Sequence, residues 1–574
     1  MTELLTAAQM RAIEQAAIDS GEVTGLMLME RAGAGVVEAI FEEWPALAAT
    51  SHRAVVLCGP GNNGGDGFVV ARLLKEWGWQ VEVFFYGNEG KLPTNAKVNC
   101  ARWRQIGDVT PLTEKAFRNE FSLQKCAYAD VYVDALFGTG LKRALEGDAF
   151  DVISHMAGRN GDDYRSRTVA IDAPSGLCLD SGRVLEREIQ DVPGHDRIFE
   201  VVKAYGLENR LKSRTGRKPF QDRFAAMTVV FDSPKVGHFI ADGPACSGKI
   251  YIKDIGLRAF REMNIRKGFT KGPMKPMHTT LLCDKPLLED NRTFGPKPFI
   301  YNKFKKHKYT YGHAYILSGP AAKTGAARLA ARGALRIGAG VVTVACSPDA
   351  VAEHAAQLTA IMLTPVAGAQ ALRAVLEDQR INAVCVGPAL GLDQDQADIL
   401  TAVLKAERAT VIDADGLTLL AQHPDLMGLL HDKCILTPHG GEFVRMFPDI
   451  AEKLATPTNK GPAYSKVDAT RDAAKRAGCV VLFKGADTVI AAPDGCCAIN
   501  SAHYERTASW LATAGSGDVL AGFITGLLAR GFIPVQAAQT GAWLHVECAL
   551  NFGPGLIAED IPEQLPKVFR KLGL

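Results

Sequence analysis

The sequence predicts an α/β protein with two domains, each built on a largely parallel β-sheet. The chain has 574 residues, more than the ~250–300 that a single hydrophobic core usually organises. In the first half, short apolar runs lead into glycine loops. In the second half, apolar runs alternate with helical patterns and show little two-residue periodicity, which is typical of strands buried on both faces.

The composition favours an enzyme with small-molecule partners. The net charge is +2, and 22% of the residues are charged, so the chain has no global bias toward nucleic acid or membranes. No apolar run approaches the ~20 residues of a membrane span, and the first residues do not resemble a signal peptide. Thirteen scattered cysteines without a CxxC pair indicate neither a disulfide framework nor a zinc site. We therefore expect a cytoplasmic enzyme that binds neither nucleic acid nor membranes.

The first half begins with two amphipathic helices, at residues 10–18 and 26–41, followed by a strand at 54–58. The glycine loop 59–67 comes next, and a helix is expected over 68–77. The loop satisfies GxGxxG after a strand, a pattern that is weak on its own. A dehydrogenase would have an acidic ribose ligand at the end of the next strand, but Glu82 lies inside that strand. Asn62, Asn63 and Asp66 are interpreted as residues that hold a ligand and a cation.

Two further strands, at 131–133 and 168–171, end in Asp134 and Asp172, and a glycine loop follows each. Since the carboxyl ends of parallel strands share one edge of a sheet, we expect Asn63, Asp134, Asp172 and Ser175 to converge on one crevice. Their oxygens suit a hard or alkali cation. The alternative for each aspartate is a helix N-cap.

These motifs resemble those of NAD(P)H-hydrate epimerases. The segments that carry the resemblance are 61–67 (GNNGGDG), 134–140 (DALFGTG), 172–176 (DAPSG), 233–238 (SPKVGH) and 254–256 (DIG). The resemblance implies a Rossmann-like three-layer α/β/α domain with Asp172 as the acid–base residue and a potassium ion on Asn63, Asp134 and Ser175. It also implies that the hydrated nucleotide binds Asn62, Asn63, Gly64, Gly65, Asp66, Gly138, Thr139, Gly140, Leu141, Lys142, Arg143, Ala144 and Asp172.

The segment from Phe260 to Lys308 has prolines, basic residues and little periodicity, so we expect a linker there. The next domain opens with a strand at 314–317, the loop 319–326, a helix at 327–337 and a strand at 341–344. The loop is not a P-loop, because Ser318 and Ala322 replace the two glycines of GxxxxGK[ST].

The segment 511–522 (LATAGSGDVLAG) is the strongest chemical signal in the chain. A helix that starts near Gly517 presents unpaired N–H groups to a phosphate. Asp518 would be repelled by that phosphate unless it faces a substrate hydroxyl, as a general base does. The alternative is that Asp518 caps the helix.

Four more loops follow strands on the same sheet edge, at 387–391, 413–416, 437–442 and 484–488. Together with segment 511–522 they resemble ADP-dependent NAD(P)H-hydrate dehydratases, which have a ribokinase-like α/β fold. The resemblance implies that ADP or AMP binds Lys484, Gly485, Ala486, Asp487, Thr488 and Gly517. It places the hydrated nucleotide on Gly325, Ala326, Gly387, His439 and Asp518, and it implies magnesium in this domain.

The sequence thus predicts an epimerase domain at 1–260, a linker and lead-in at 261–300 and a dehydratase domain at 301–574. The expected substrates are the hydrates of NADH and NADPH together with ADP, and a homo-oligomer is expected. The alternative is a ribokinase-like vitamin or sugar kinase fused to a non-catalytic nucleotide-binding module. An insertion at about 184–224 interrupts the first domain; its acidic and basic residues nearly balance, which favours a surface excursion over a nucleic-acid tract.

Overall fold

The computed structural model describes residues 2–120, 129–157, 167–186, 224–261, 280–283 and 307–573. They form two compact units: residues 4–277 with 457–465, and residues 1–3, 278–456 and 466–574. We call these the N-terminal and the C-terminal unit. Most of the predicted insertion and most of the predicted linker lie outside the described residues.

The N-terminal unit contains a seven-stranded sheet in which all strand pairs are parallel. From one edge to the other the strands are β10 (Lys249–Lys253), β9 (Met227–Phe231), β6 (Thr168–Ile171), β5 (Val131–Ala135), β2 (Arg53–Cys58), β3 (Gln80–Phe85) and β4 (Val109–Pro111). A short antiparallel pair, β7 (Leu177–Cys178) and β8 (Arg183–Val184), lies beside it.

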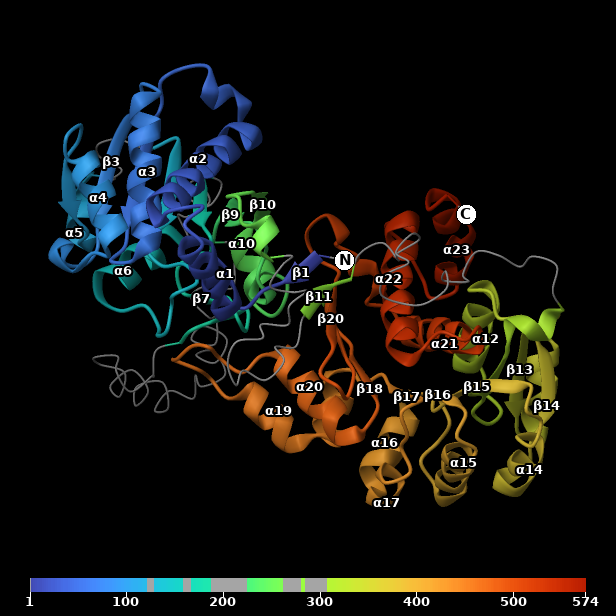
Figure 1. Ribbon diagram of the computed structural model, residues 1–574. Coiled ribbons are helices and arrows are strands. Elements are labelled where there is room, and N and C mark those ends of the chain that lie inside the picture. Colours follow the sequence, from blue (N-terminus) through green and yellow to red (C-terminus); the bar gives the residue numbers. More distant parts are fainter. Residues whose placement is uncertain are drawn as a thin grey trace, which may run out of the picture. The chain divides into compact units, whose positions relative to one another are not determined.

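Helices cover both faces of this sheet, since separate hydrophobic cores form on its two sides (Figure 1). One core packs α1 (Ala7–Asp19), α2 (Gly25–Glu43), α3 (Asn62–Glu76) and α4 (Thr94–Trp103) against the strands. The other packs α5 (Glu114–Glu120) and α6 (Gly147–Ala157), and the short α10 (Gly243–Ser247) precedes β10. Consecutive residues of β2 face opposite cores: Val56 packs in the first, and Val55 and Leu57 pack in the second. Because both faces of the strand are buried, its sequence is an uninterrupted apolar run.

Helix α3 begins at Asn62, six residues earlier than the sequence predicts. Glycines are needed in this early start because the helix passes very close to neighbouring backbone and side-chain atoms. A Cβ on Gly64 would lie 1.9 Å from the Gly59 carbonyl oxygen, and one on Gly65 would lie 2.6 Å from Met29 Sδ. The polar residues of the expected loop are therefore in the first turns of a helix, where N–H groups lack internal partners.

The C-terminal unit contains an eleven-stranded sheet that is mostly parallel. In order across the sheet the strands are β1 (Thr2–Leu4), β11 (Thr280–Leu282), β20 (Cys497–Ser501), β19 (Asp487–Ala491), β18 (Val480–Phe483), β17 (Cys434–Leu436), β16 (Ala409–Ile412), β15 (Ile381–Val386), β12 (His313–Leu317), β13 (Val341–Cys346) and β14 (Met362–Pro365). Strand β19 runs antiparallel to both of its neighbours.

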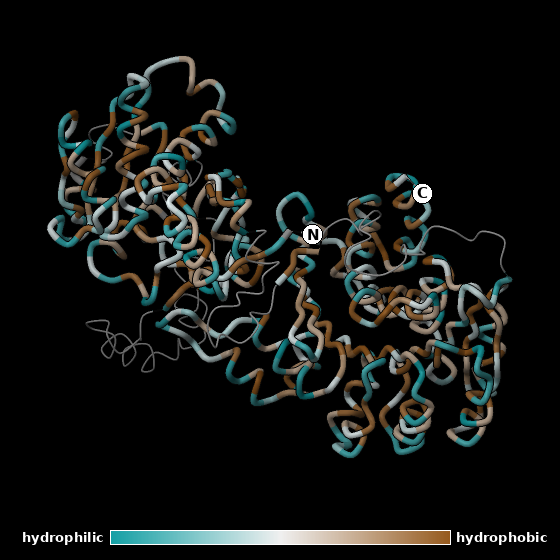
Figure 2. Tube along the Cα trace, viewed as in Figure 1, coloured by the Kyte–Doolittle hydropathy of each residue, from teal (hydrophilic) through white to brown (hydrophobic). Residues whose placement is uncertain are grey.

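Helices lie on both faces of this sheet as well (Figure 1). One face packs α12 (Gly325–Arg336), α21 (Ser516–Ala529), α22 (Pro534–Phe552) and α23 (Asp560–Lys571) into the main core. The other α-helices among the described residues of this unit are α13 (Val351–Ala355), α14 (Gly368–Val375), α15 (Gln394–Lys405), α16 (Asp415–Gln422), α17 (Pro424–Met427), α18 (Gly440–Met446), α19 (Pro448–Ala455) and α20 (Lys466–Ala477). Hydrophobic residues concentrate in the central strands, as Figure 2 shows. The α/β fold class predicted for both halves is confirmed.

Each sheet has a point where its strand order reverses. In the N-terminal unit the chain moves outward from β2 to β3 and β4, and then returns to place β5 on the other side of β2. In the C-terminal unit the same reversal separates β12 from β15. Ligands of open parallel sheets bind beyond the carboxyl ends of the strands at such points, and the predicted site residues follow these strands.

Candidate active sites

Asp172 lies just after β6 in a left-handed backbone conformation (φ 63°) and forms a buried ion pair. Its Oδ1 accepts a hydrogen bond from Lys235 Nζ at 2.8 Å, and the Lys235 side chain is 1% exposed. A buried charge is tolerated when it is paired and hydrogen-bonded, so Lys235 and Asp172 compensate each other's charge at this position. The sequence analysis did not select Lys235, although it lies within the SPKVGH motif.

His238 fixes the backbone around this ion pair. Its Nδ1 accepts a hydrogen bond from the Lys235 N–H at 3.0 Å, so its Nε2 carries the proton and donates to the Asp172 carbonyl oxygen at 2.9 Å. Burial, together with the Lys235 charge, lowers the pKa of His238 to about 4. His238 is thus a neutral structural group at physiological pH.

Asp134 and Ser175, two of the predicted potassium ligands, are in direct contact. Asp134 accepts hydrogen bonds from the Ser175 N–H at 2.7 Å and from Ser175 Oγ at 2.6 Å. Burial raises the pKa of Asp134 to about 6, although the hydrogen bonds from Ser175 oppose this shift. Asn63 lies beside the same loop, because a Cβ on Gly138 would lie 2.9 Å from Asn63 Oδ1. Asn63 Nδ2 is buried without a hydrogen-bond partner.

The loop 138–144 supplies most of the other predicted epimerase residues. Arg11 Nη1 on α1 donates to the Thr139 carbonyl oxygen at 3.3 Å. Residues 457–465 also pair with this loop: the Gly461 N–H donates to the Lys142 oxygen, and the Ala144 N–H donates to the Asn459 oxygen. Of this set, Asn62, Gly140, Lys142 and Arg143 are exposed, whereas Gly64, Gly65 and Ala144 are buried.

Glu82 lies inside β3 and accepts a hydrogen bond from Arg53 Nε at 3.0 Å. This is a structural contact between neighbouring strands rather than a ribose ligand.

In the C-terminal unit, helix α21 starts at Ser516 after Gly515, which is left-handed (φ 84°). Asp518 lies in its first turn. Burial, with the nearby Asp413 charge, raises the pKa of Asp518 to about 6, and Lys484 partly offsets this. A carboxylate with a pKa near 6 is ionised at neutral pH and accepts a proton more readily than an ordinary aspartate.

Lys484 follows β18 and forms an ion pair with Asp413, which follows β16. The Nζ–Oδ1 distance is 2.7 Å, and Glu442 Oε2 lies 3.8 Å from the same ammonium. Burial opposes the ammonium charge, but Asp413 and Glu442 outweigh it and raise the pKa of Lys484. Thr437 Oγ1 also donates to Asp413 Oδ1, at 2.8 Å.

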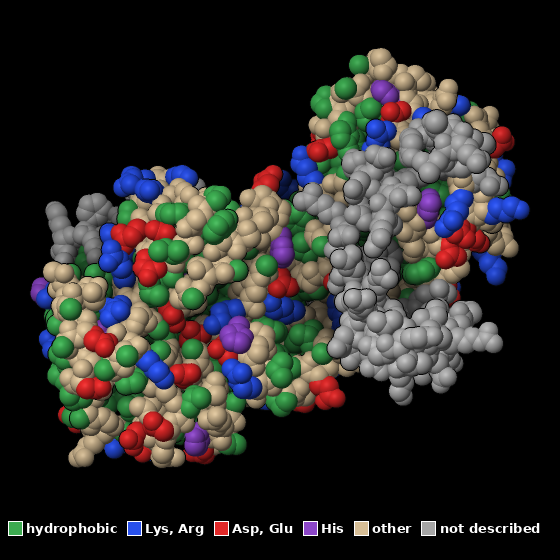
Figure 3. Space-filling view, turned by 180° about the vertical axis from the view of Figure 1, so that it is seen from behind, with side chains coloured by type: hydrophobic (Ala, Val, Ile, Leu, Met, Phe, Trp, Pro, Cys, Tyr) green, Lys and Arg blue, Asp and Glu red, His purple; other side chains and the backbone are tan. Residues whose placement is uncertain are grey.

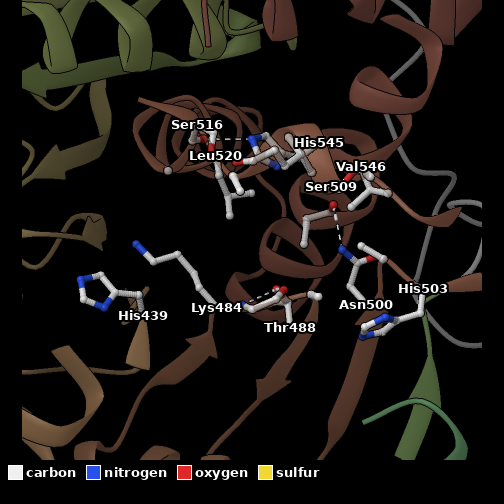
Figure 4. Close-up of a pocket in the computed structure, with 18 of the residues that line it drawn as sticks. His439, Lys484, Thr488, Asn500, His503, Ser509, Ser516, Leu520, His545 and Val546 are labelled. Carbon is white, nitrogen blue, oxygen red and sulfur yellow. Dashed lines mark hydrogen bonds between the residues drawn. The ribbon is translucent and has the colours of Figure 1, made fainter. Parts of the chain in front are cut away.

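A cavity of about 670 Å³ opens beside Lys484. Figure 4 shows Lys484 and His439 on one side of it, Asn500 and His503 on the other, and Ser516 and Leu520 of α21 above them. The predicted residues among its lining are His439, Lys484, Gly485, Ala486, Thr488 and Gly517. The cavity therefore brings together almost the whole predicted nucleotide site.

Asp487 does not line this cavity. Its Oδ1 binds Lys466 Nζ at 2.7 Å, and the same ammonium also contacts the carbonyl oxygens of Asp487 and Lys484. Thr488 Oγ1 closes the turn by donating to the Gly485 oxygen at 2.7 Å. Asp487 therefore shapes the turn that presents Lys484.

The residues predicted to bind the hydrated nucleotide spread beyond the cavity. His439 lines it, and the imidazole Nδ1 accepts from the Gly441 N–H at 2.9 Å. Gly387 lies after β15 with φ 122°. A Cβ on Gly387 would lie 1.8 Å from the backbone carbonyl oxygen of Asp413. Gly325 and Ala326 begin α12 across the β12/β15 reversal. A second cavity of about 160 Å³ opens there, lined by Ser318 and Leu390 among others.

Asp413 and Glu442 lie in two of the loops expected at this sheet edge, but the sequence predicted no role for either, and it gave no signal for His545. Asp413 ends a strand just as Asp134 and Asp172 do, so the same pattern could have identified it. His545 lies on α22, far from any motif, and its Nε2 hydrogen-bonds the Ser516 carbonyl oxygen at 2.9 Å. Among the residues described, no group of three or more His, Cys, Asp or Glu side chains could hold a metal ion.

Comparison with known proteins assigns both halves. A family described as "NAD(P)H-hydrate dehydratase" matches residues 314–566, and one described as "YjeF-related protein N-terminus" matches residues 25–192. A protein of Moorella thermoacetica named bifunctional NAD(P)H-hydrate repair enzyme is 32% identical, over 99% of this chain and 97% of its own length. The chain belongs to the family of bifunctional NAD(P)H-hydrate repair enzymes.

Other relatives of this repair-enzyme chain match one half each. An NAD(P)H-hydrate epimerase of Roseobacter litoralis is 46% identical over 45% of this chain and 100% of its own length. A solved structure of Bacillus subtilis, titled ADP/ATP-dependent NAD(P)H-hydrate dehydratase co-crystallized with ATP/Mg2+, is 27% identical and has a TM-score of 0.40, over 48% of this chain and 94% of that one. Within the described residues, no helix is long and apolar enough to cross a membrane.

Proposed function

We propose that this chain repairs hydrated nicotinamide nucleotides with two active sites. The N-terminal site, in domain 1–260, interconverts the R and S hydrates of NADH and NADPH. The C-terminal site, in domain 301–574, dehydrates the S epimer with ADP and releases AMP and phosphate. The observation that carries this proposal is the match to bifunctional relatives along nearly the whole chain, supported by a separate strand-end site in each unit.

The arrangement in the C-terminal unit fits phosphoryl transfer to a substrate hydroxyl. Asp518 removes the proton of the C6 hydroxyl, whose oxygen attacks the β-phosphorus of ADP while the bond to AMP breaks. The C6–O bond then breaks, phosphate leaves, and the ring N1 electron pair forms the N1=C6 bond. Loss of a proton from C5 restores the reduced nicotinamide. Lys484, at the cavity wall, binds the phosphates.

Magnesium fits the C-terminal site without a dedicated cage. Mg²⁺ is usually held by one or two carboxylates together with the phosphates of a nucleotide. Asp413, beside Lys484, is the described carboxylate that we assign to it. When bound, the ion would neutralise charge on the phosphates.

Potassium fits the N-terminal site through oxygen ligands. Asn63, Asp134 and Ser175 offer an amide, a carboxylate and a hydroxyl, which suit an alkali cation better than a transition metal. The Asp134 carboxylate is buried and makes no ion pair with any described residue, and a cation would supply the missing charge. When bound, the ion would hold the loops and the nucleotide in position, and Asp172 would transfer a proton at the hydrated ring.

The site residues, magnesium, potassium, a cytoplasmic location and homo-oligomeric assembly stay predictions. Figure 3 shows Lys, Arg, Asp and Glu side chains intermixed over the described part of one face, a pattern that accords with small-molecule partners.

The decisive experiment supplies a mixture of both hydrate epimers with ADP and follows recovery of the reduced-nicotinamide absorbance. Complete recovery, with AMP and phosphate formed in equal amounts, is expected. A stable phosphorylated alcohol would instead identify a kinase. Recovery that stops at the S fraction would show that the N-terminal unit does not epimerise.

A further inference from the structure

Helix α1 lies along the candidate epimerase site. Its Arg11 reaches the Thr139 oxygen in the loop 138–144. Just before the helix, the Leu5 N–H donates to the Pro234 oxygen at 3.2 Å, and Leu5 pairs with Lys235. Glu14 is three residues after Arg11, so it projects from the same face of the helix. The helix is thus docked at the loop 138–144 and beside Lys235, and Glu14 on it lies near enough to Asp172 and Lys235 for their charges to act on its carboxyl group.

Charged groups from several elements surround Glu14. Arg11 lies on its own helix, Asp172, Asp232 and Lys235 follow strands of the sheet, and Asp66 lies on α3. Burial, with the charge of Asp172, raises the pKa of Glu14 to about 7, while Lys235 and Arg11 oppose the rise. Glu14 is therefore able to hold or release a proton near neutral pH.

Asp172 and Asp66 lie in environments that differ from that of Glu14. Asp172 Oδ1 is paired with the buried ammonium of Lys235, an arrangement that suits the proton-accepting partner rather than the donor. Burial and the charges of Asp172 and Glu14 raise the pKa of Asp66 well above its ordinary value. Two titratable groups in contrasting environments mark a general acid and a general base.

We propose that Glu14 is a second catalytic residue of the epimerase site, which donates a proton while Asp172 accepts one. This assignment rests on the proposed epimerase function and adds to it a group that the family resemblance does not supply.

Inversion at C6 places the departing and the arriving oxygen on opposite faces of the ring, so one group on each face serves the two proton transfers. Glu14 protonates the C6 hydroxyl, the C6–O bond breaks, water leaves, and the N1 electron pair forms the N1=C6 bond. Water then adds to the other face of C6, its extra proton passes to Asp172, and the electron pair returns to N1. One proton has moved from Glu14 to Asp172, and the reverse epimerisation, or exchange with solvent, returns it.

The test is Glu14→Gln in the full chain, assayed by separating the two epimers of NADPH hydrate over time. Epimerisation above the uncatalysed rate should fall by at least about 100-fold, while ADP-dependent dehydration of pure S epimer stays within twofold. Asp19→Asn, an exposed position on the same helix, is the matched control and should keep both activities. Wild-type chain that fails to epimerise would refute the proposed function itself. Near-normal epimerisation by Glu14→Gln would refute only the role of Glu14.

The pH dependence separates proton donation from a structural role. In the wild type, kcat/KM for conversion of the R epimer should decline as the pH rises through about 7, because Glu14 loses its proton. Lys235 lowers the pKa of Glu14, so Lys235→Met should move this decline to higher pH in whatever epimerase activity it retains. A wild-type profile that stays flat through pH 7 would overturn the proposal even if Glu14→Gln failed to fold.

Thermal stability gives a readout without turnover. The pKa of Glu14 is raised on folding from 4.5 to about 7, so its protonated form favours the folded state below pH 4.5, and this contribution is lost as the pH rises through 7. Glutamine does not ionise. The Tm of Glu14→Gln relative to wild type should therefore increase across that interval, and a constant difference would contradict the assignment.

Discussion

At the scale of single residues, Asp518 is the proposed general base of dehydration. We predict that Asp518→Asn lowers the ADP-dependent dehydration rate by at least about 100-fold, because asparagine cannot accept the hydroxyl proton. Epimerisation should be unchanged, since its residues belong to the other compact unit. Both rates are measured on one preparation, so the epimerase activity reports correct folding. A near-normal dehydration rate would return Asp518 to the role of helix cap.

The charge of Asp518 also predicts a pH dependence. The base must be ionised, and its pKa is raised to about 6, so dehydratase kcat/KM should fall as the pH drops through 6. Asp413 contributes to that rise; Asp413→Asn should therefore move the decline to lower pH. If kcat/KM of Asp413→Asn falls at the same pH as that of the wild type, a group other than Asp518 causes the pH dependence.

At the scale of elements, the close approach of the loops after β15 and β16 depends on Gly387. A Cβ at this position would overlap the backbone carbonyl oxygen of Asp413. The φ of Gly387 is 122°, a conformation that residues with a side chain rarely adopt. We predict that Gly387→Ala lowers the stability of the folded protein by more than the ~1–3 kcal/mol of backbone strain alone, with loss of dehydration.

Gly391→Ala in the same loop is the matched control. Its φ is 103°, but the nearest atom to its Cβ would be Gln396 Cγ at 3.5 Å, so it carries the strain without the overlap. Chemical denaturation compares the two variants. Equal losses of stability would show that strain, and not the overlap with Asp413, makes glycine necessary at position 387.

The ends of β2, β5 and β6 together supply the predicted potassium site. We predict that replacing potassium by sodium slows epimerisation, because Asn63, Asp134 and Ser175 offer oxygen ligands and only one charge. Asp134→Asn should raise the potassium concentration needed for half-maximal epimerisation by at least about tenfold. If the wild-type epimerase rate is the same in potassium and in sodium, these three residues do not form a functional potassium site.

At the scale of the whole molecule, the insertion at 184–224 stays a prediction, since residues 187–223 lie outside the described part of the chain. We predict that replacing Glu186 to Asp222 by a short Gly/Ser linker leaves both catalytic rates within about twofold and Tm nearly unchanged, because long surface loops cost little closure entropy. Circular dichroism and both activity assays provide the measurement. A folded variant without epimerase activity would make the insertion part of the Asp172 site.

The sequence by itself determined the α/β class and the strands that lead into the predicted site loops, such as those at 54–58, 131–133 and 168–171, because apolar runs and glycine loops are local signals. It also indicated Asp134, Asp172 and Asp518, since each stands where a strand or helix pattern changes. The start of α3 was placed too late because glycine-rich segments have low helix propensity in isolation; here the helix forms because tertiary packing needs residues without a Cβ.

Only the tertiary structure decided which charges meet. Lys235 pairs with Asp172 across 63 positions of the chain and Lys484 with Asp413 across 71. Helix α1, which carries Glu14, follows Leu5, and Leu5 pairs with Lys235. No local pattern encodes such pairs, because sheet order and helix docking set these distances and burial then shifts the pKa values. The sequence thus supplied the residues capable of chemistry, and the fold set the protonation states in which they work.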